Sequence, residues 1–385
     1  MTQRARLGCI LFTWCIVMGL PPGALADRIK SDNSLRSALD RAVEAESVKF
    51  FQSGCRVGLS VAIVNPEGTF YYDYGATTRA GPKLANSRSL YEIASVTKVF
   101  TAVLAARSVI DQRMTRDGDF RSYLPKTYSN LAWEGQAITL RWLVTHRSGM
   151  PRDIPDTDAI FAKNDLRTRP YELIAISKGY DHGRTLSALR DVRLQSVPGE
   201  REAYSNAGFL VIGFGLETVY AEPVEQLISQ MILNPLRMTS TGFSVRSDDR
   251  FRLVRGYDRY GQAMPYHPRN AGAAWGLYST TEDMARFVSW QLDERDPVVE
   301  QSHQPLVGNA RKGVAMAWNL ALADDQPMLW HGGGSFGMSA QLVLYPQQRE
   351  GYVMLTNDTC EATESALANI AISLHGRVSS DAVQN

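Results

Sequence analysis

The sequence predicts an α/β fold in which an antiparallel sheet is flanked by helices and a mostly helical lobe is inserted between its strands. Three observations support this prediction. Segments with the apolar, β-branched composition of strands lie near both ends of the chain. The stretch from residue 111 to about residue 236 has helical and irregular patterns instead. No repeat, low-complexity tract or Pro/Ser linker interrupts the middle of the chain. Strands at both ends with helices between them indicate one sheet lobe containing a helical insertion.

The first 26 residues differ from the rest and predict a secretory signal peptide. Arg4 and Arg6 supply positive charge, residues 7–20 are mostly apolar but short for a membrane span, and Ala24-Leu25-Ala26 is a small-x-small cleavage site. An uncleaved N-terminal anchor is the alternative. Cleavage after Ala26 would leave residues 27–385 as a periplasmic or secreted protein without stable membrane insertion.

The mature chain is predicted to begin with a helix and a strand pair. A charged, amphipathic pattern predicts a helix from Ser34 to about Phe51. The apolar run 56–64 predicts a strand, 65–68 a turn, and 69–74 the returning strand. This pair begins the predicted sheet.

The next predicted helix contains the first candidate for chemistry, Ser95 and Lys98, followed by the apolar run 99–106. Positions three apart lie on one face of a helix, so these side chains are expected to touch. A serine hydroxyl becomes a nucleophile when a neighbouring base takes its proton, and a lysine is that base when burial lowers its pKa. The helix start adds N–H groups that favour an oxyanion. The alternative is structural, with Ser95 as a cap and Lys98 as a solvated side chain.

Helical patterns follow, over residues 138–146, 206–220 and 222–233. The second of these helices follows Tyr204 and includes Asn206 at its start. Tyr204 could share the serine proton or protonate a leaving group if positive neighbours lower its pKa. Asn206 offers a side-chain amide to a substrate carbonyl.

The tripeptide Tyr204-Ser205-Asn206 has an earlier copy, Tyr128-Ser129-Asn130. Either copy alone could be structural. We favour the later one because it lies between the Pro198-Gly199 turn and an apolar helix, which together form a rigid mount.

Strand patterns return near the end of the chain and are followed by a last helix. The predicted strands are 313–322, 339–345 and 351–356, and the predicted helix is 361–374.

A third candidate stretch ends another short strand, at His331-Gly332-Gly333-Gly334. Three glycines allow a substrate backbone to approach and leave N–H groups free, so Gly334 could complete an oxyanion hole with Ser95. His331 could bind a carboxylate when charged, or donate a hydrogen bond. The alternative is a tight glycine turn with an incidental histidine.

Two of the four cysteines, Cys55 and Cys360, lie outside the predicted signal peptide. Cys55 precedes the first predicted strand and Cys360 follows the last, so antiparallel pairing of these strands would bring the cysteines together. A Cys55–Cys360 disulfide is the resulting hypothesis, with two free buried thiols as the alternative.

The composition is that of a globular enzyme. A formal net charge of +1 gives no indication of nucleic-acid or anionic-membrane binding, and 44% hydrophobic residues suffice for a large core.

The three candidate stretches, taken in order, resemble the signatures of the penicillin-recognising serine hydrolases. These are Ser95-Val96-Thr97-Lys98, Tyr204-Ser205-Asn206 and His331-Gly332-Gly333. The family includes class C β-lactamases, low-molecular-mass DD-peptidases and related esterases and amidases. The likeness extends over the whole mature chain, and the Tyr-x-Asn form resembles class C rather than class A. It implies a β-lactamase/transpeptidase-like fold over residues 27–385.

The resemblance also implies roles. Ser95 would be acylated, Lys98 would be its base, and Tyr204 would protonate the leaving nitrogen. Asn206 would hold the substrate amide, and the Ser95 and Gly334 N–H groups would form the oxyanion hole. No metal or cofactor is implied.

One departure bears on the substrate. Class C β-lactamases usually have Lys-Thr-Gly where this chain has His331-Gly332-Gly333. Losing the threonine hydroxyl removes a hydrogen bond to the substrate carboxylate, on the order of 1.5–3 kcal/mol for a charged partner. A histidine there resembles certain DD-peptidases and D-amino-acid peptidases.

We therefore expect a secreted serine acyl hydrolase, first of all a D-Ala-D-Ala-type peptidase (carboxypeptidase or endopeptidase) with weak β-lactamase activity. The alternatives are a carboxylesterase or D-amino-acid amidase of the same fold, and a non-catalytic peptidoglycan-binding relative. The expected substrates are a peptidoglycan stem peptide, a β-lactam or an ester, with no nucleic-acid partner.

Overall fold

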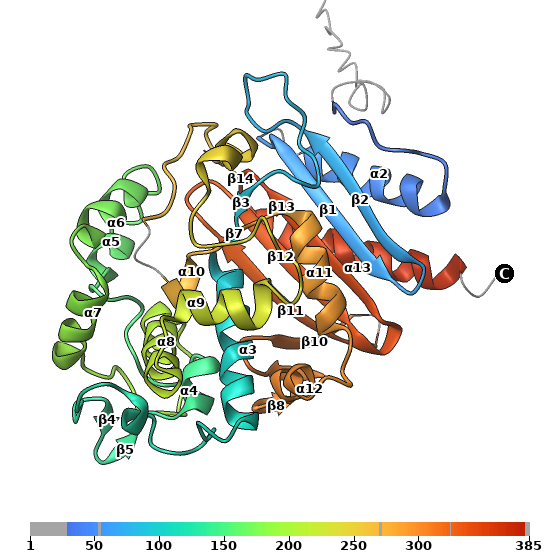
Figure 1. Cartoon of the computed structure of the whole chain (residues 1–385). Helices are drawn as coiled ribbons and strands as arrows, with labels where there is room; N and C mark the ends of the chain where they lie inside the picture. The colour runs from blue at the N-terminus through green and yellow to red at the C-terminus, as the bar shows by residue number, and fades with distance from the viewer. Residues whose placement is uncertain (1–28, 53–54, 269–271, 324, 382–385) are drawn as a thin grey trace, which may run out of the picture.

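The computed structural model describes residues 29–52, 55–268, 272–323 and 325–381. The predicted signal peptide, residues 1–26, lies outside the described residues. Figure 1 shows a large twisted sheet with helices on both faces and a helical lobe to one side.

The main sheet has eight strands in the order β2-β1-β13-β12-β11-β10-β9-β8, and all neighbouring strands are antiparallel. The strand bounds are β1 Gly58–Asn65, β2 Gly68–Gly75, β8 Val307–Asn309, β9 Lys312–Val314, β10 Asn319–Ala323, β11 Gln326–Gly334, β12 Ser339–Tyr345 and β13 Glu350–Thr356. Leu59 of β1 lies opposite Thr356 of β13. The predicted pairing of the first and last long strands is therefore confirmed.

Three short two-stranded pairs accompany the main sheet. They are β3 Tyr91–Glu92 with β7 Tyr278–Ser279, β4 Ala132–Trp133 with β5 Gln136–Ala137, and β6 Tyr257–Asp258 with β14 Asp358–Thr359. The first pair leads directly into the Ser95 stretch, so it fixes the approach of the chain to that residue.

Two helices from opposite ends of the chain cover one face of the sheet, α2 Ala38–Phe51 and α13 Thr363–Asp381 (Figure 1). Alternate residues of β1 point to this face, and Leu59 and Val61 pack there with Val43 of α2. The predicted N-terminal helix begins at Ala38 rather than Ser34. Ser37 ends the preceding extended segment because its hydroxyl accepts from Asp40 N–H in a capping box.

The remaining helices lie on the other side of the sheet or in the helical lobe (Figure 1). These are α3 Thr97–Ile110, α4 Leu140–Val144, α5 Asp158–Ala162, α6 Arg169–Ser177, α7 His182–Ala188, α8 Asn206–Tyr220, α9 Val224–Ile228, α10 Gly272–Trp275, α11 Thr281–Gln291 and α12 Pro297–His303. Short 3₁₀ turns are η1 Ala94–Val96, η2 Phe120–Tyr123, η3 Leu189–Asp191, η5 Ser247–Arg252 and η7 Pro346–Gln348. Helices α4 to α9 lie within the predicted insertion. Eleven of the 14 residues of α3 are buried, between this insertion and the sheet.

Two predicted elements are divided in the structure. The predicted helix 222–233 is α9 followed by a π-helical turn, Ser229–Leu233. The predicted strand 313–322 is β9 and β10, separated by a buried turn in which Ala317 has a φ of 62°. Residues 315–318 are apolar because the turn is buried, so composition alone resembled a continuous strand.

No single helix in the described ranges is long and apolar enough to span a membrane. The pair 206–220 and 224–233 reaches that length and composition only when taken together, across a bend of 79°.

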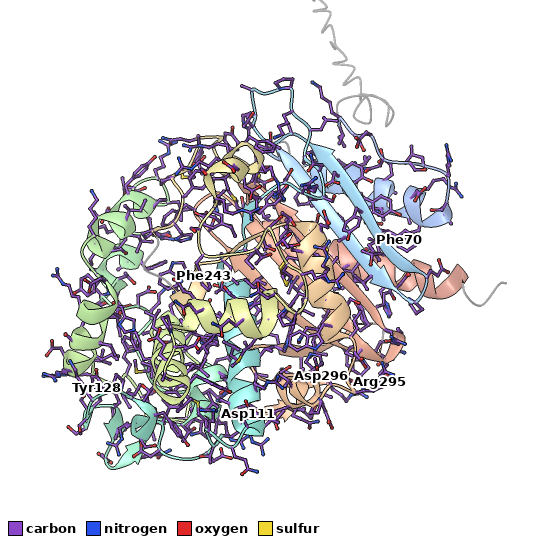
Figure 2. All side chains as sticks on the ribbon, viewed as in Figure 1. Phe70, Asp111, Tyr128, Phe243, Arg295 and Asp296 are labelled. Carbon is purple, nitrogen blue, oxygen red and sulfur yellow. A yellow bond between two sulfur atoms is a disulfide. The ribbon has the colours of Figure 1, made fainter. Side chains whose placement is uncertain are left out.

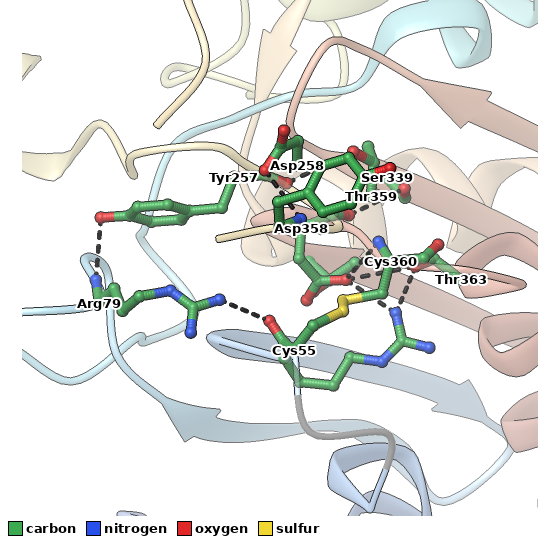
Figure 3. The surroundings of a disulfide bond; sticks show 12 residues. Cys55, Arg79, Tyr257, Asp258, Ser339, Asp358, Thr359, Cys360 and Thr363 are labelled. Atoms are coloured by element: carbon green, nitrogen blue, oxygen red, sulfur yellow. Dashed lines mark hydrogen bonds and ion pairs between the residues drawn. A yellow bond between two sulfur atoms is a disulfide. The ribbon is translucent and has the colours of Figure 1, made fainter. Parts of the chain in front are cut away.

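A disulfide joins Cys55 to Cys360, which confirms the sequence hypothesis (Figure 3). The two Cα atoms are 6.1 Å apart. Beside it, the buried guanidinium of Arg56 forms a 2.8 Å ion pair with Asp358. The disulfide thus connects the segment before β1 to the segment after β13, next to the start of α13.

Candidate active site

Ser95 lies in η1, in the turn that joins β3 to α3. The preceding residue, Ala94, has a φ of 45°, a left-handed conformation that a residue with a side chain adopts only when its surroundings require it. Lys98 lies in the first turn of α3, and its Nζ donates to Ser95 Oγ over 3.1 Å. The predicted contact between the two side chains is therefore present.

Lys98 is completely buried. Its Nζ also donates to the carbonyl of Ala274 over 2.8 Å and lies 5.0 Å from the ring centre of Tyr204. Burial lowers the pKa of Lys98 well below its ordinary value; Asp153 opposes this effect and Arg152 adds to it. The neutral amine is thus favoured, as a base for Ser95 requires.

Tyr204 approaches Ser95 from the helical lobe. Its hydroxyl lies 2.6 Å from Ser95 Oγ, so the serine contacts both Lys98 and Tyr204. Desolvation at the site raises the pKa of Tyr204 to about 12, and this exceeds the lowering by Ser95 and Arg152. The positive neighbour Arg152 does lower this pKa, but burial is the larger effect, so the condition of a lowered pKa, set from the sequence, is not met. Tyr204 is a neutral phenol that can donate a proton.

Asn206 is the first residue of α8, which Ser205 caps by accepting from Gly208 N–H. Its Nδ2 donates to Asp153 Oδ1 over 2.6 Å, whereas its Oδ1 is buried without a hydrogen-bond partner among the described residues. The acceptor carboxylate fixes which amide atom faces it. The Oδ1 atom is therefore available to accept from a substrate N–H. The expected donation to a substrate carbonyl remains a prediction, because Nδ2 has a second N–H beside the one that Asp153 accepts.

Strand β11 passes directly beside the Ser95 turn. At Gly333 an added Cβ would overlap the carbonyl oxygen of Ile93 and lie 3.1 Å from the nitrogen of Ser95, so only glycine fits. Gly334 is exposed and borders the same cavity as Ser95. That the N–H groups of Ser95 and Gly334 form the oxyanion hole remains a prediction.

His331 lies at the same end of β11 and is buried. Its Nδ1 is 2.8 Å from the carbonyl oxygen of Gly332, so Nδ1 carries the proton and Nε2 has the free lone pair. Burial, with the charge of Lys98 as a second cause, lowers the pKa of His331 to about 4. Binding of a carboxylate by a charged His331 is therefore not supported near pH 7, because the imidazole is neutral there.

A cavity of about 600 Å³ lies where these elements meet. Ser95, Tyr204, Asn206, His331 and Gly334 line it, with Lys98 buried behind Ser95. The sequence thus identified the centre of the site. Five charged lining residues were not predicted, Arg152, Asp153, Arg169, Glu202 and Glu364. They lie in loops or at helix starts, where no periodicity or motif indicates a direction.

The earlier tripeptide copy is structural. Tyr128 is buried in the helical lobe, where its hydroxyl donates to the carbonyl of Leu186 over 2.9 Å (Figure 2). Asn130 donates to the carbonyls of Leu189 and Val192. Of the two tyrosines, Tyr204 and not Tyr128 contacts Ser95, as the preference for the later copy requires.

Comparison with known proteins agrees with this geometry. The model of the beta-lactamase family matches residues 38–377. Protein flp of Staphylococcus aureus (strain N315) is 26% identical over 341 residues, which cover 84% of this chain and 64% of that protein. A beta-lactamase of Lysobacter lactamgenus is 26% identical over 264 residues, covering 67% and 62%. The chain thus spans somewhat less than two thirds of the length of these curated relatives.

Solved structures share the fold. A beta-lactamase/D-alanine carboxypeptidase from Pseudomonas syringae has a TM-score of 0.75 at 19% identity, over 88% of this chain and 99% of that one. A class C beta-lactamase has a TM-score of 0.75 at 17% identity, over 90% and 98%. The predicted β-lactamase/transpeptidase-like fold is confirmed.

Proposed function

Because the chain belongs to the beta-lactamase family, we propose that it is a secreted serine acyl hydrolase that works through a Ser95 acyl-enzyme. The observation that supports this most directly is the pair of contacts to Ser95 Oγ, from Lys98 at 3.1 Å and from Tyr204 at 2.6 Å. A serine placed against a buried amine and a phenol has both a proton acceptor and a proton donor within reach.

The reaction follows from these contacts. Lys98 takes the Ser95 proton while Oγ attacks the acyl carbon, and the N–H groups beside the turn stabilise the negative oxygen. Tyr204 donates its proton to the leaving nitrogen or oxygen as the bond to carbon breaks, and the proton on Lys98 then restores the phenol. Water hydrolyses the Ser95 ester in the second half, with Lys98 again as the base.

The charges at the β11 end favour substrates without a free carboxylate on the leaving side. His331 is neutral, and Glu364 Oε1 lies only 2.9 Å from the point where a Cβ on Gly334 would be. Two carboxylates about 4 Å apart in water repel by about 1 kcal/mol. A carboxylesterase or D-amino-acid amidase is therefore the function that this site supports best.

A D-Ala-D-Ala-type peptidase with weak β-lactamase activity is the second candidate. The similarity to the Lysobacter lactamgenus beta-lactamase, 26% identity over 67% of this chain, favours this candidate.

Intact-protein mass spectrometry tests the acyl-enzyme. The protein is mixed separately with p-nitrophenyl butyrate, a D-amino-acid p-nitroanilide and benzylpenicillin, with Ser95→Ala as the control. We expect an acyl adduct or Ser95-dependent turnover with the ester or the anilide. Absence of both with all three compounds would contradict the hydrolase and favour a non-catalytic peptidoglycan-binding relative.

Amidation of a D-Ala-D-Ala peptide separates the two candidates. If the leaving side accepts neutral groups better, the peptide with a C-terminal amide is hydrolysed at least as fast as the free acid. Glu364→Gln should then narrow the difference between these two rates. Glu361→Gln is the matched control because Glu361 is exposed on the same segment but does not line the cavity. Hydrolysis of the free acid alone would favour the carboxypeptidase.

Export belongs to the same proposal. The predicted signal peptide and the Cys55–Cys360 disulfide support an oxidising compartment, periplasmic or extracellular. N-terminal sequencing of the protein from its native source should give a chain beginning at Asp27, and an intact Met1 would contradict cleavage.

A further inference from the structure

Two arginines face the cavity from the helical lobe. Arg152 follows Pro151, and Arg169 is the first residue of α6. Both line the cavity, and both guanidinium groups lie over the ring of Phe161, at 4.2 Å for Arg152 and 4.8 Å for Arg169. Stacking on one aromatic ring holds the two planar groups near each other and restricts their orientation.

The positive charge of this pair is only partly compensated. Asp153 Oδ2 lies 3.6 Å from Arg152 Nε, but the carboxylate already accepts from Asn206 at 2.6 Å and from Thr157 at 2.5 Å. Arg169 forms no ion pair within 4.0 Å in the described part of the chain. The Nε atoms of Arg152 and Arg169 are buried without a hydrogen-bond partner there.

The pair lies next to the reacting centre. The Arg152 guanidinium is 5.5 Å from the ring centre of Tyr204, whose hydroxyl contacts Ser95. Asn206, with its unpartnered Oδ1, lines the same cavity and is bonded to Asp153, the residue after Arg152. The part of the lining formed by β11 and the start of α13 contains the neutral His331 and the carboxylate of Glu364.

We propose that Arg152 and Arg169 form a subsite for a carboxylate on the acyl part of the substrate. This rests on the proposed hydrolase function and specifies its substrate class: acyl groups that end in a carboxylate, joined to a neutral or cationic leaving group. A planar carboxylate suits two guanidinium groups because each can donate two parallel N–H bonds to it. Burial and the neighbouring Arg152 lower the pKa of Arg169, a repulsion that a bound anion would relieve.

Paired chromogenic esters test the subsite. The compounds are p-nitrophenyl hemiadipate and its methyl ester, which differ only in the terminal charge and have a chain long enough to avoid attack by their own carboxylate. We expect kcat/KM to be about tenfold higher for the hemiadipate at low salt, and this ratio to fall with added NaCl. In Arg169→Gln and in Arg152→Gln the ratio should fall severalfold.

Arg184→Gln is the matched control. Arg184 is in α7, where its guanidinium lies over Tyr180, and it does not line the cavity. Its substitution should leave the ratio unchanged. Two results would overturn the subsite without affecting the hydrolase proposal. One is a wild-type ratio of kcat/KM values, hemiadipate to methyl ester, of one. The other is a ratio that neither Arg152→Gln nor Arg169→Gln changes.

Binding to Ser95→Ala distinguishes this failure from failure of the proposed function. Calorimetry with adipate on that variant should show binding that Arg169→Gln weakens at least tenfold. If neither ester is turned over in a Ser95-dependent way but adipate binding is present and depends on Arg169, the carboxylate subsite is supported and the hydrolase function is contradicted. Absence of adipate binding together with a ratio of one would exclude the subsite.

Discussion

The side chains nearest Ser95 are held in their uncharged forms by burial. Lys98 is enclosed, and the pKa of each nearby imidazole, His146, His267 and His331, lies below the ordinary value. Burial is the largest cause in all four groups, and the charge of Lys98 is a second cause for the histidines. Burial, together with the charge of Arg152, disfavours the ammonium form of Lys98. The cluster therefore keeps the base ready to accept the serine proton.

The pH dependence of acylation should report the protonation of Lys98. With a neutral ester, kcat/KM should rise with pH as the ammonium loses its proton, since only the amine is a base. Arg152 contributes to the lowered pKa of Lys98. Arg152→Gln should therefore move the acid limb to higher pH, by up to about one unit. Arg184→Gln should leave the profile in place, and a shift of the Arg152→Gln limb to lower pH would contradict the assignment of Lys98.

The histidines also predict a loss of stability in acid. The pKa values of His267 and His331 are about 4 in the folded protein, against 6.5 for an exposed imidazole. The unfolded chain binds more protons between these values, so this stability is present above pH 6.5 and is lost as the pH falls to about 4. The loss is at most on the order of 3 kcal/mol for each histidine.

A variant isolates this effect from other groups. Burial raises the pKa of Asp73 to about 6, which acts in the opposite sense because its protonated form is favoured in the folded state. Urea unfolding at pH 7 and pH 4.5 should show a smaller decrease in unfolding free energy for His331→Gln than for the wild type. Equal decreases would show that His331 does not contribute.

At the scale of elements, the approach of β11 to the Ser95 turn determines the site. Gly333 packs against the backbone of Ile93 and Ser95, and the left-handed Ala94 lies between these two residues. The C-terminal end of β11 and the turn that contains Ser95 are thus packed directly against each other. A change in their separation would move Ser95 relative to Tyr204, which comes from a different lobe.

Alanine substitutions in β11 test this packing. Gly333→Ala should reduce stability by about 1–3 kcal/mol and kcat by about 10²-fold, because backbone atoms must move to admit the Cβ. Gly332→Ala is the comparison: the one close contact of its Cβ would be the side-chain oxygen of Gln341, at 2.9 Å, which can rotate away, and the next atoms lie at 3.8 and 3.9 Å. Circular dichroism melts and ester turnover measure both, and equal effects of the two substitutions would contradict the argument.

Elements with local end signals could be predicted from the sequence. Helix α8 has the predicted bounds because Ser205 caps it and the apolar run is uninterrupted. Strand β12 also has the predicted bounds, with every residue buried and a proline after it. The break between β9 and β10 could not be predicted, since its turn is apolar and depends on burial supplied by other segments.

In the reacting centre, the contact between Ser95 and Lys98 could be predicted from the sequence, whereas the protonation states could not. Ser95 and Lys98 are three residues apart, so helical geometry alone brings them together. The protonation states of Tyr204 and His331 were not predictable, because they depend on burial by segments far away in the chain. The same holds for Asp153, which determines the orientation of the Asn206 amide only once the loop is folded.

At the scale of the whole molecule, the site is an assembly of distant segments held by the two ends of the chain. Strands β1 and β13 pair next to the β2 edge of the sheet, and α2 and α13 cover one face together (Figure 1). Glu364 belongs to the first turn of α13, four residues after Cys360. The position of the acidic end of the cavity therefore depends on how this junction is fixed to the sheet.

The disulfide should stabilise this arrangement as a whole. Cys55 and Cys360 are separated by 305 positions, so the bond closes nearly the entire mature chain and limits the unfolded state. Replacing both with serine should lower the unfolding free energy by about 2–5 kcal/mol. Calorimetry with and without reductant measures this, and reductant should lower the Tm of the wild type but not of the double variant. Because the Arg56–Asp358 pair and the β1–β13 pairing remain, the reduced protein should still fold and retain Ser95-dependent turnover at moderate temperature. An unchanged wild-type Tm in reductant, with both thiols shown to be free, would mean that non-covalent packing alone fixes the junction.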